Sequence, residues 1–427
     1  MTRRLVGAGA VLAVLALAQP AIAQPPAASA APVEQLTFDE AVERARARNP
    51  SVGEAAQAIL RAEALLGGAR AVFLPLAYGS VGTTVLDEAR GFDDNIVQPR
   101  TQTAFSVTVS YALFDAVRWA GRNQAADRVA TARAAARETR QHVAVLAAQA
   151  YLAVTAAERQ REIAQRNRDT AQALEDYARA RLEAGQGSRL NHVRAVQQRA
   201  SADGLVQLAK LAVRRAQEAL GVAVFAEGPV GARGEPSLPP AAVPADDAWL
   251  SARPDVQLFT AELRARDRIV ADAWKSWLPT ATASFTPRYV TPAGLFEPSK
   301  SWRALFQLEI PLFDGSLGAE KSVKIADRES TRLRLDGLRV EARSELRSAQ
   351  EAVRRSETIV ASTREAAEAA AEALRITEIA YRAGATTNVE VVQAQQAARN
   401  AEIEAAVAED RLRQARLDLL VALGQFP

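Results

Sequence analysis

Cysteine is absent from the 427-residue sequence, and histidine occurs only at His142 and His192. The lack of cysteine excludes disulfides, thiolate metal sites and a cysteine-linked lipid anchor, so non-covalent contacts must hold the fold. The two histidines are far apart in the sequence, which argues against a Ser-His-Asp triad or a metal cluster. No glycine-rich phosphate loop occurs, which argues against a nucleotide site. We therefore expect no catalytic residues, no metal and no cofactor.

Neither sign of charge dominates, because 53 basic residues are mixed with 50 acidic ones along the chain. Such mixing is typical of solvated helix faces and argues against a nucleic-acid partner. Long apolar runs are missing as well. Beyond the first residues, no segment reaches the roughly 18 uninterrupted apolar residues of a spanning helix. If the chain crosses a bilayer, we expect strands to do so.

The first 23 residues have the features of a secretory signal peptide. Two arginines precede an apolar run from Leu5 to about Ala18, and a small-x-small cleavage site ends at Ala23. A membrane anchor is the alternative, but the run is shorter than the roughly 20 residues that a spanning helix needs. We expect residues 24–35, which are rich in proline and alanine, to form a flexible leader.

The rest of the chain contains a tandem duplication. A helical stretch, an alternating segment, a turn and a very long helical stretch follow one another in the same order in both halves. The paired landmarks are Phe73-Leu74-Pro75 and Trp277-Leu278-Pro279, Leu113-Phe114-Asp115 and Leu312-Phe313-Asp314, and Gly185 and Gly384. A repeat of this length predicts a fold made of two copies of one unit. We assign the first repeat to 36–221, a linker belt to 222–245 and the second repeat to 246–424.

Each repeat contains segments with the period-two alternation of a β-strand. In 105–113, apolar residues alternate with small or polar ones, and 302–312 shows the same pattern. Weaker strands are expected at 76–85 and 280–290, so that each repeat forms a hairpin. The apolar side of the last segment includes Phe306, Leu308 and Ile310, and its polar side carries Arg303, Gln307 and Glu309.

Strands of about ten residues have the length needed to cross an outer membrane at a tilt. A barrel requires about eight or more strands, so four strands cannot close one. We therefore expect the chain to supply its strands to an oligomer, with Arg303, Gln307 and Glu309 facing the lumen. The alternative is a sheet packed on a soluble core, but no adjacent segment covers the charged residues of the polar side.

The long helical stretches, 116–184 and 315–383, contain no proline and very little glycine. At 1.5 Å per residue each would be roughly 100 Å long. Apolar residues in the first stretch recur at spacings of three, four and seven, as in a coiled coil. Helices of about half this length are expected at 38–71, 190–220, 246–274 and 389–423. Two half-length helices placed end to end would match one long helix.

These landmarks resemble the TolC family of outer-membrane channel proteins. The most specific features are the duplication, the two Leu-Pro turns, the two Leu-Phe-Asp turns, and 380–384 (AYRAG) followed by 389–392 (VEVV). The resemblance implies a mainly α fold with a small β part. Three chains would form a homotrimer, with a 12-stranded β-barrel in the outer membrane and a long coiled-coil α-barrel in the periplasm.

The resemblance also implies a function. Family members are passive exit ducts that dock with a periplasmic adaptor protein and an inner-membrane pump, for drug or metal efflux or for type I protein secretion. The partners would be these two proteins, two further copies of the chain and outer-membrane lipid. The alternative is a periplasmic coiled-coil scaffold or adaptor without a pore, and the strand alternation argues against it.

The resemblance further implies a gate at the two periplasmic tips. An acidic residue six positions after the tip glycine narrows the aperture in the family, and this position is Glu390 in the second repeat and Asn191 in the first. Tyr381 matches a gate tyrosine that bonds across helices, whereas Thr386 replaces an arginine found in some members. The alternative for Glu390 is a solvated carboxylate favoured by the helix dipole. The tip residues are thus Gly185, Asn191, Tyr381, Gly384, Thr386 and Glu390.

Overall fold

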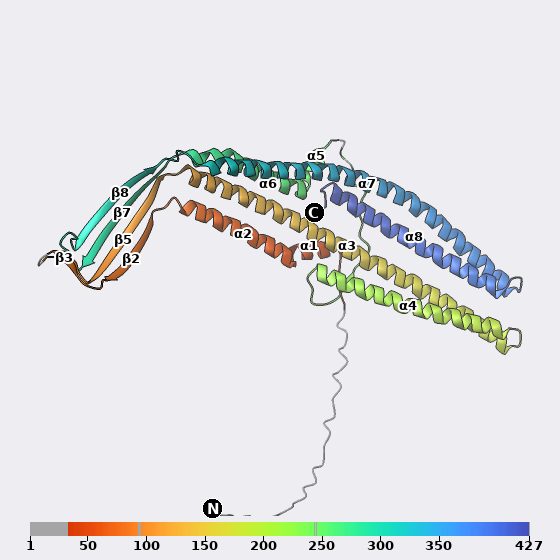
Figure 1. Ribbon diagram of the computed structural model, residues 1–427. Coiled ribbons are helices and arrows are strands. Elements are labelled where there is room, and N and C mark those ends of the chain that lie inside the picture. Colours follow the sequence, from red (N-terminus) through yellow and green to blue (C-terminus); the bar gives the residue numbers. More distant parts are fainter. Residues whose placement is uncertain (1–32, 93–94, 243, 245, 427) are drawn as a thin grey trace, which may run out of the picture.

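The computed structural model describes residues 33–92, 95–242, 244 and 246–426. The molecule is elongated, with a sheet at one end and two helical turns at the other (Figure 1). Residues 1–32, which contain the expected signal peptide and most of the leader, lie outside the described residues. The mainly α fold with a small β part is confirmed.

The sheet contains four strands in the order β2-β5-β7-β8, and all neighbours are antiparallel. The strands are β2 (Leu76–Val85), β5 (Thr101–Phe114), β7 (Thr280–Thr291) and β8 (Lys300–Glu309). Each repeat contributes one hairpin, and the β5–β7 pair joins the two hairpins. A short extra hairpin, β3 (Arg90–Phe92) and β4 (Asn95–Gln98), extends the loop of the first repeat.

Strand β8 is shorter than the sequence suggests. It ends at Glu309, so Ile310 lies beyond the paired strand. The reason is Pro311, which has no N–H group to donate to a neighbouring strand.

The strand pairing places the polar and the apolar residues on opposite faces of the sheet, as the sequence predicts. Gln307 lies opposite Thr282 and Arg303 lies opposite Thr286, whose hydroxyl is 3.1 Å from the hydroxyl of Thr108. These residues form the polar face. The opposite, apolar face includes Phe105, Val109, Phe285, Tyr289, Trp302, Phe306 and Leu308.

The long helices α3 (Ala116–Glu183) and α7 (Gly315–Arg382) contain 68 residues each. Each begins after the aspartate of a Leu-Phe-Asp turn, whose side chain accepts backbone N–H groups of the first turn. Each ends at a glycine with positive φ, 74° at Gly185 and 76° at Gly384. No helix in the described part of the chain is both long and apolar enough to span a membrane.

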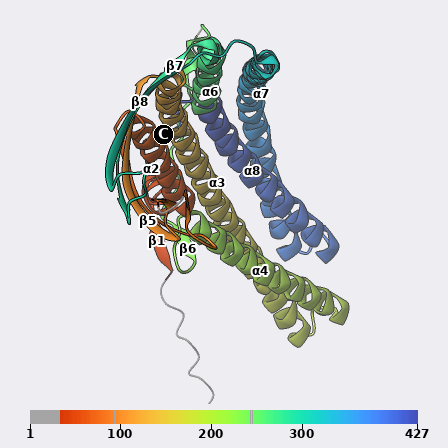
Figure 2. The same cartoon turned by 60° about the vertical axis from the view of Figure 1, so that its left-hand side comes forward.

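Shorter helices line the long ones in two stacked sets (Figures 1 and 2). Near the sheet lie α1 (Phe38–Arg48), α2 (Pro50–Ala71), α5 (Ala248–Ala252), α6 (Pro254–Asp272) and the 3₁₀ turn η1 (Ala273–Trp277); near the tips lie α4 (Arg189–Ala223) and α8 (Asn388–Ala422). Pro50 and Pro254 each occupy a first helical position, where the missing N–H costs nothing. The tip end therefore consists of two helical hairpins, α3–α4 and α7–α8.

The largest fully buried side chain at mid-height is Tyr151 of α3. Its hydroxyl lies 3.0 Å and 2.9 Å from the carbonyl oxygens of Arg233 and Gly234 in the linker. Nearby, β1 (Glu34–Leu36) pairs in parallel with β6 (Val230–Ala232) of the linker. Residues 34 and 35 are therefore strand residues and not part of a flexible leader, because this pairing satisfies their backbone groups.

Candidate functional site

Both helical tips reverse through the same backbone turn. In the first repeat, the N–H of Gly185 donates to the carbonyl of Leu182 (3.0 Å), and the N–H of Gln186 donates to the carbonyl of Arg181 (2.9 Å). The turn at Gly384 repeats both hydrogen bonds. Glycine adopts positive φ without a steric cost, so these two glycines fix where the chain reverses.

After each turn, a hydroxyl cap starts the next helix. Ser188 accepts a hydrogen bond from the N–H of Leu190 (3.2 Å), and Thr387 accepts one from the N–H of Glu390 (3.4 Å). The carboxylate of Glu390 also accepts a hydrogen bond from the hydroxyl of Thr386. Glu390 is thus an exposed carboxylate in the first turn of α8, where the helix dipole stabilises it.

An apolar cluster connects the two tips. This cluster, which we call the tip joint, consists of Leu174, Ala178, Ala195, Tyr381 and Val391. Tyr381 is only 7% exposed, and its ring lies edge-on to the ring of Tyr177 with centroids 5.7 Å apart. Burial raises the pKa of the Tyr381 hydroxyl. The joint therefore holds the end of α7 against α3 and α4.

The Tyr381 hydroxyl has no hydrogen-bond partner among the residues that the structure describes. Among these residues, Tyr381 therefore does not form the cross-helix bond that the family resemblance implies. Within the chain, Tyr381 acts through the packing of its ring.

A cavity of about 460 Å³ lies beside the tip joint, between the two tips. Among the residues lining it are Arg181, Asn191, Arg194, Tyr381, Gly384, Thr386 and Asn388. The fold thus brings together four of the six tip residues expected from the sequence, whereas Gly185 and Glu390 lie outside this lining. Arg303, Gln307 and Glu309 lie on the sheet, at the other end of the molecule.

Asn388 was not expected at this site. It is 3% exposed, and neither atom of its amide has a partner within the described residues. An asparagine in the first turn of a helix is usually solvated, so the sequence gives no signal that this one is buried.

A group of charged side chains lies near the middle of the long helix α3. Arg159 of α3 contacts three carboxylates: Glu235 in the linker, Glu409 at 3.2 Å and Asp410 at 3.0 Å, the last two on α8. Arg413 contacts Glu235 at 2.6 Å and Asp410 at 2.9 Å. We call these five residues the belt cluster. It ties α8 of the second repeat to the long helix of the first.

Within the belt cluster, the carboxylate of Asp410 is partly buried. Burial raises the pKa of Asp410, although Arg159 and Arg413 act in the opposite direction. The Oδ2 atom of Asp410 has no hydrogen-bond partner in the described part of the chain. The sequence gives no signal for this cluster, because charges at helical spacing are typical of solvated faces.

Several solved outer-membrane proteins have the same fold. The CmeC channel of Campylobacter jejuni gives a TM-score of 0.76 at 16% identity, covering 91% of this chain and 86% of that one. VceC of Vibrio cholerae gives 0.75 at 18% identity, covering 91% and 96%. The open-state MtrE channel of Neisseria gonorrhoeae gives 0.74 at 20% identity, covering 91% and 88%.

A search of curated protein sequences finds no relative. In contrast, the sequence matches the family described as outer membrane efflux protein over residues 41–224 and 247–425. The two matched segments follow the two repeats and leave out part of the linker between them. The chain therefore belongs to the outer membrane efflux protein family, and it is a protein of the outer membrane.

Proposed function

We propose that three copies of this chain form the outer-membrane exit duct of a tripartite efflux or type I secretion system. The observation that carries this proposal is the open four-stranded sheet. Its edge strands, β2 and β8, have no second neighbour within the described chain. Unpaired edges attract further strands. Three sheets joined edge to edge would give a closed barrel of 12 strands, and a cyclic arrangement closes naturally.

The apolar face of the sheet supports the same assembly. Trp302 is 71% exposed and Phe306 is 77% exposed in the single chain. An apolar surface of this kind marks contact with lipid or protein. A periplasmic scaffold without a pore, the alternative, would leave both the open edges and this face without a partner.

The helices give the duct its length. A helix of 68 residues is about 100 Å long. Such helices would carry the tips far into the periplasm, where a periplasmic adaptor and an inner-membrane pump would dock. We propose that the duct is passive and that the pump supplies the energy for drug, metal-ion or protein export.

Labelling of single introduced cysteines tests the barrel. The chain contains no cysteine, so only the introduced thiol reacts. We expect Gln307→Cys and Glu309→Cys to react rapidly with a water-soluble, membrane-impermeant thiol reagent, because they would face the lumen. Phe306→Cys and Leu308→Cys should react slowly, because lipid would cover them. Equal rates at Phe306 and Gln307 would refute the barrel.

We propose that the tips form the gate, with one Glu390 carboxylate from each chain around the aperture. Glu390 is exposed and makes no ion pair with any residue that the structure describes. Confined carboxylates attract cations and favour their passage. Arg303, Gln307 and Glu309 would line the barrel, where the pore is wider and their influence on selectivity weaker.

Glu390→Gln should lower the cation selectivity of the channel by about half and weaken its block by divalent cations, because it removes the charge ring at nearly constant volume. Single-channel recording in planar bilayers, with and without millimolar divalent cation, measures both effects. Asn191→Asp is the matched control, since it adds a carboxylate at the equivalent position of the first repeat and should raise selectivity. Unchanged selectivity in Glu390→Gln would leave this residue as a solvated helix-start carboxylate.

A further inference from the structure

The loop between β7 and β8, residues 292–299, folds over the polar face of the sheet. One carboxylate oxygen of Glu297 lies 2.5 Å from Nη1 of Arg288 on β7. Its other oxygen accepts a hydrogen bond from Nε2 of Gln102 on β5 at 3.0 Å. Gln102 also donates to the carbonyl of Pro292 at 3.3 Å. Glu297 thus bridges the hairpins of both repeats.

The contacted residues belong to the polar face. Arg288 lies opposite Ser106 of β5, whose hydroxyl is 2.8 Å from that of Ser80 on β2. Gln102 lies four residues before Ser106 on the same strand, so its side chain is on the same side. The loop covers Gln102 so fully that the residue is only 7% exposed, even in a single chain.

A second set of contacts fixes the loop against β4. The N–H of Leu295 donates to the carbonyl of Ile96 at 3.2 Å. A Cβ atom at Gly294 would lie 2.3 Å from the carbonyl oxygen of Val97, so this approach requires glycine. The loops of the two repeats therefore interlock at the end of the sheet farthest from the helices (Figure 1).

We propose that residues 292–299 form a constriction at the outer mouth of the duct and that Glu297 holds it in place. The inference rests on the proposed barrel, since the polar face borders a lumen only when three sheets close. In that assembly, three copies of the loop extend over one lumen and limit the size of what passes. Hydrogen bonds to a carboxylate are among the strong ones, so Glu297 is the residue whose loss should release the loop.

The test uses Gln307→Cys, inside the proposed lumen, as a reporter in intact cells. Impermeant thiol reagents of small and large size are added outside. With Glu297 present, the large reagent should react much more slowly than the small one. Glu297→Ala should increase the reaction rate of the large reagent about fivefold and leave the rate of the small reagent unchanged, because the ion pair and the Gln102 contact are lost.

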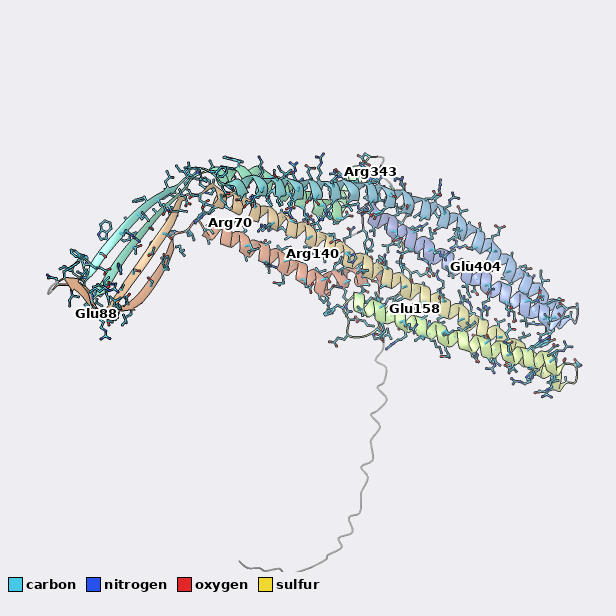
Figure 3. The ribbon with its side chains drawn as sticks, in the orientation of Figure 1. Arg70, Glu88, Arg140, Glu158, Arg343 and Glu404 are labelled. Carbon is cyan, nitrogen blue, oxygen red and sulfur yellow. The ribbon has the colours of Figure 1, made fainter. Side chains whose placement is uncertain are left out.

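Glu88→Ala is the matched control. Glu88 lies at the same end of the molecule (Figure 3). It makes no ion pair with the described residues. It should leave both rates unchanged. The charge exchange Arg288→Glu with Glu297→Arg should restore slow entry of the large reagent, which separates a specific loss of the bridge from misfolding.

The loop proposal and the barrel proposal can fail separately in this experiment. If the large reagent enters as fast as the small one before any loop substitution, or if Glu297→Ala leaves its rate unchanged, the loop is not a constriction and the channel proposal stands. If Gln307→Cys reacts no faster than Phe306→Cys even with the small reagent, the barrel itself is wrong.

Discussion

Tyr381→Ala is expected to raise the open probability of the channel about a hundredfold. Truncation of a buried aromatic side chain costs about 3 kcal/mol. Every 1.4 kcal/mol changes an equilibrium about tenfold. Tyr381 belongs to the tip joint, which packs the tips of the hairpins α3–α4 and α7–α8 against each other. Its truncation would therefore destabilise the closed state of the gate by this amount relative to the open state.

Single-channel recording in planar bilayers measures the open probability directly. Tyr381→Phe is the control, because it keeps the ring beside Tyr177 and removes only a hydroxyl that has no partner among the described residues. We expect this control to stay near the starting value. An Ala variant that opens no more often than the Phe variant would show that the tip joint does not hold the gate.

Arg159→Ala should lower the free energy of unfolding by about 2 kcal/mol, a value between that of a surface pair and that of a buried one, because the loss leaves partly buried carboxylates without their partner. Arg159 is 15% exposed and contacts Glu235, Glu409 and Asp410. Thermal unfolding in detergent at neutral pH, followed by circular dichroism, measures the loss. Arg354→Ala is the matched control, because the 72% exposed Arg354 pairs within its own helix. Surface pairs of this kind contribute about 0.5 kcal/mol.

Asp410→Asn should behave in the opposite way. Folding raises the pKa of Asp410, so the folded chain holds this proton more tightly than the unfolded chain. The resulting stability is complete below the unfolded pKa and is lost as the pH rises through the higher folded pKa. At neutral pH the buried charge is therefore a cost, and Asp410→Asn should unfold no earlier than the unsubstituted protein. If Asp410→Asn lowered the free energy of unfolding as much as Arg159→Ala does, the Asp410 charge would be stabilising.

The features predicted well from the sequence depend on local chemistry. An aspartate cap fixes where α3 and α7 begin, and a glycine with positive φ fixes where each ends. Pro50 and Pro254 mark helix starts for an equally local reason. The alternation of 302–312 also identifies the faces of β8, because neighbouring side chains of a strand point to opposite sides.

The features that were missed depend on contacts between distant segments. Strand β1 exists because β6 of the linker lies beside it, some 200 residues further along the chain. The belt cluster requires Arg159 to meet carboxylates from the linker and α8. Asn388 looks like a solvated helix-start residue, but the fold buries it. None of these contacts leaves a periodic or spacing pattern in the sequence.

In the proposed assembly, this chain is one third of a closed channel. The number of chains per particle, measured by light scattering of the purified protein in mild detergent with the detergent mass subtracted, tests it most directly. Each full-length chain has a mass of 45.7 kDa, and removal of the expected signal peptide, residues 1–23, lowers the mass of the mature chain. We predict three chains per particle and no stable folded monomer, because a single sheet would leave the edges of β2 and β8 open. A folded, stable monomer under these conditions would exclude the trimeric channel.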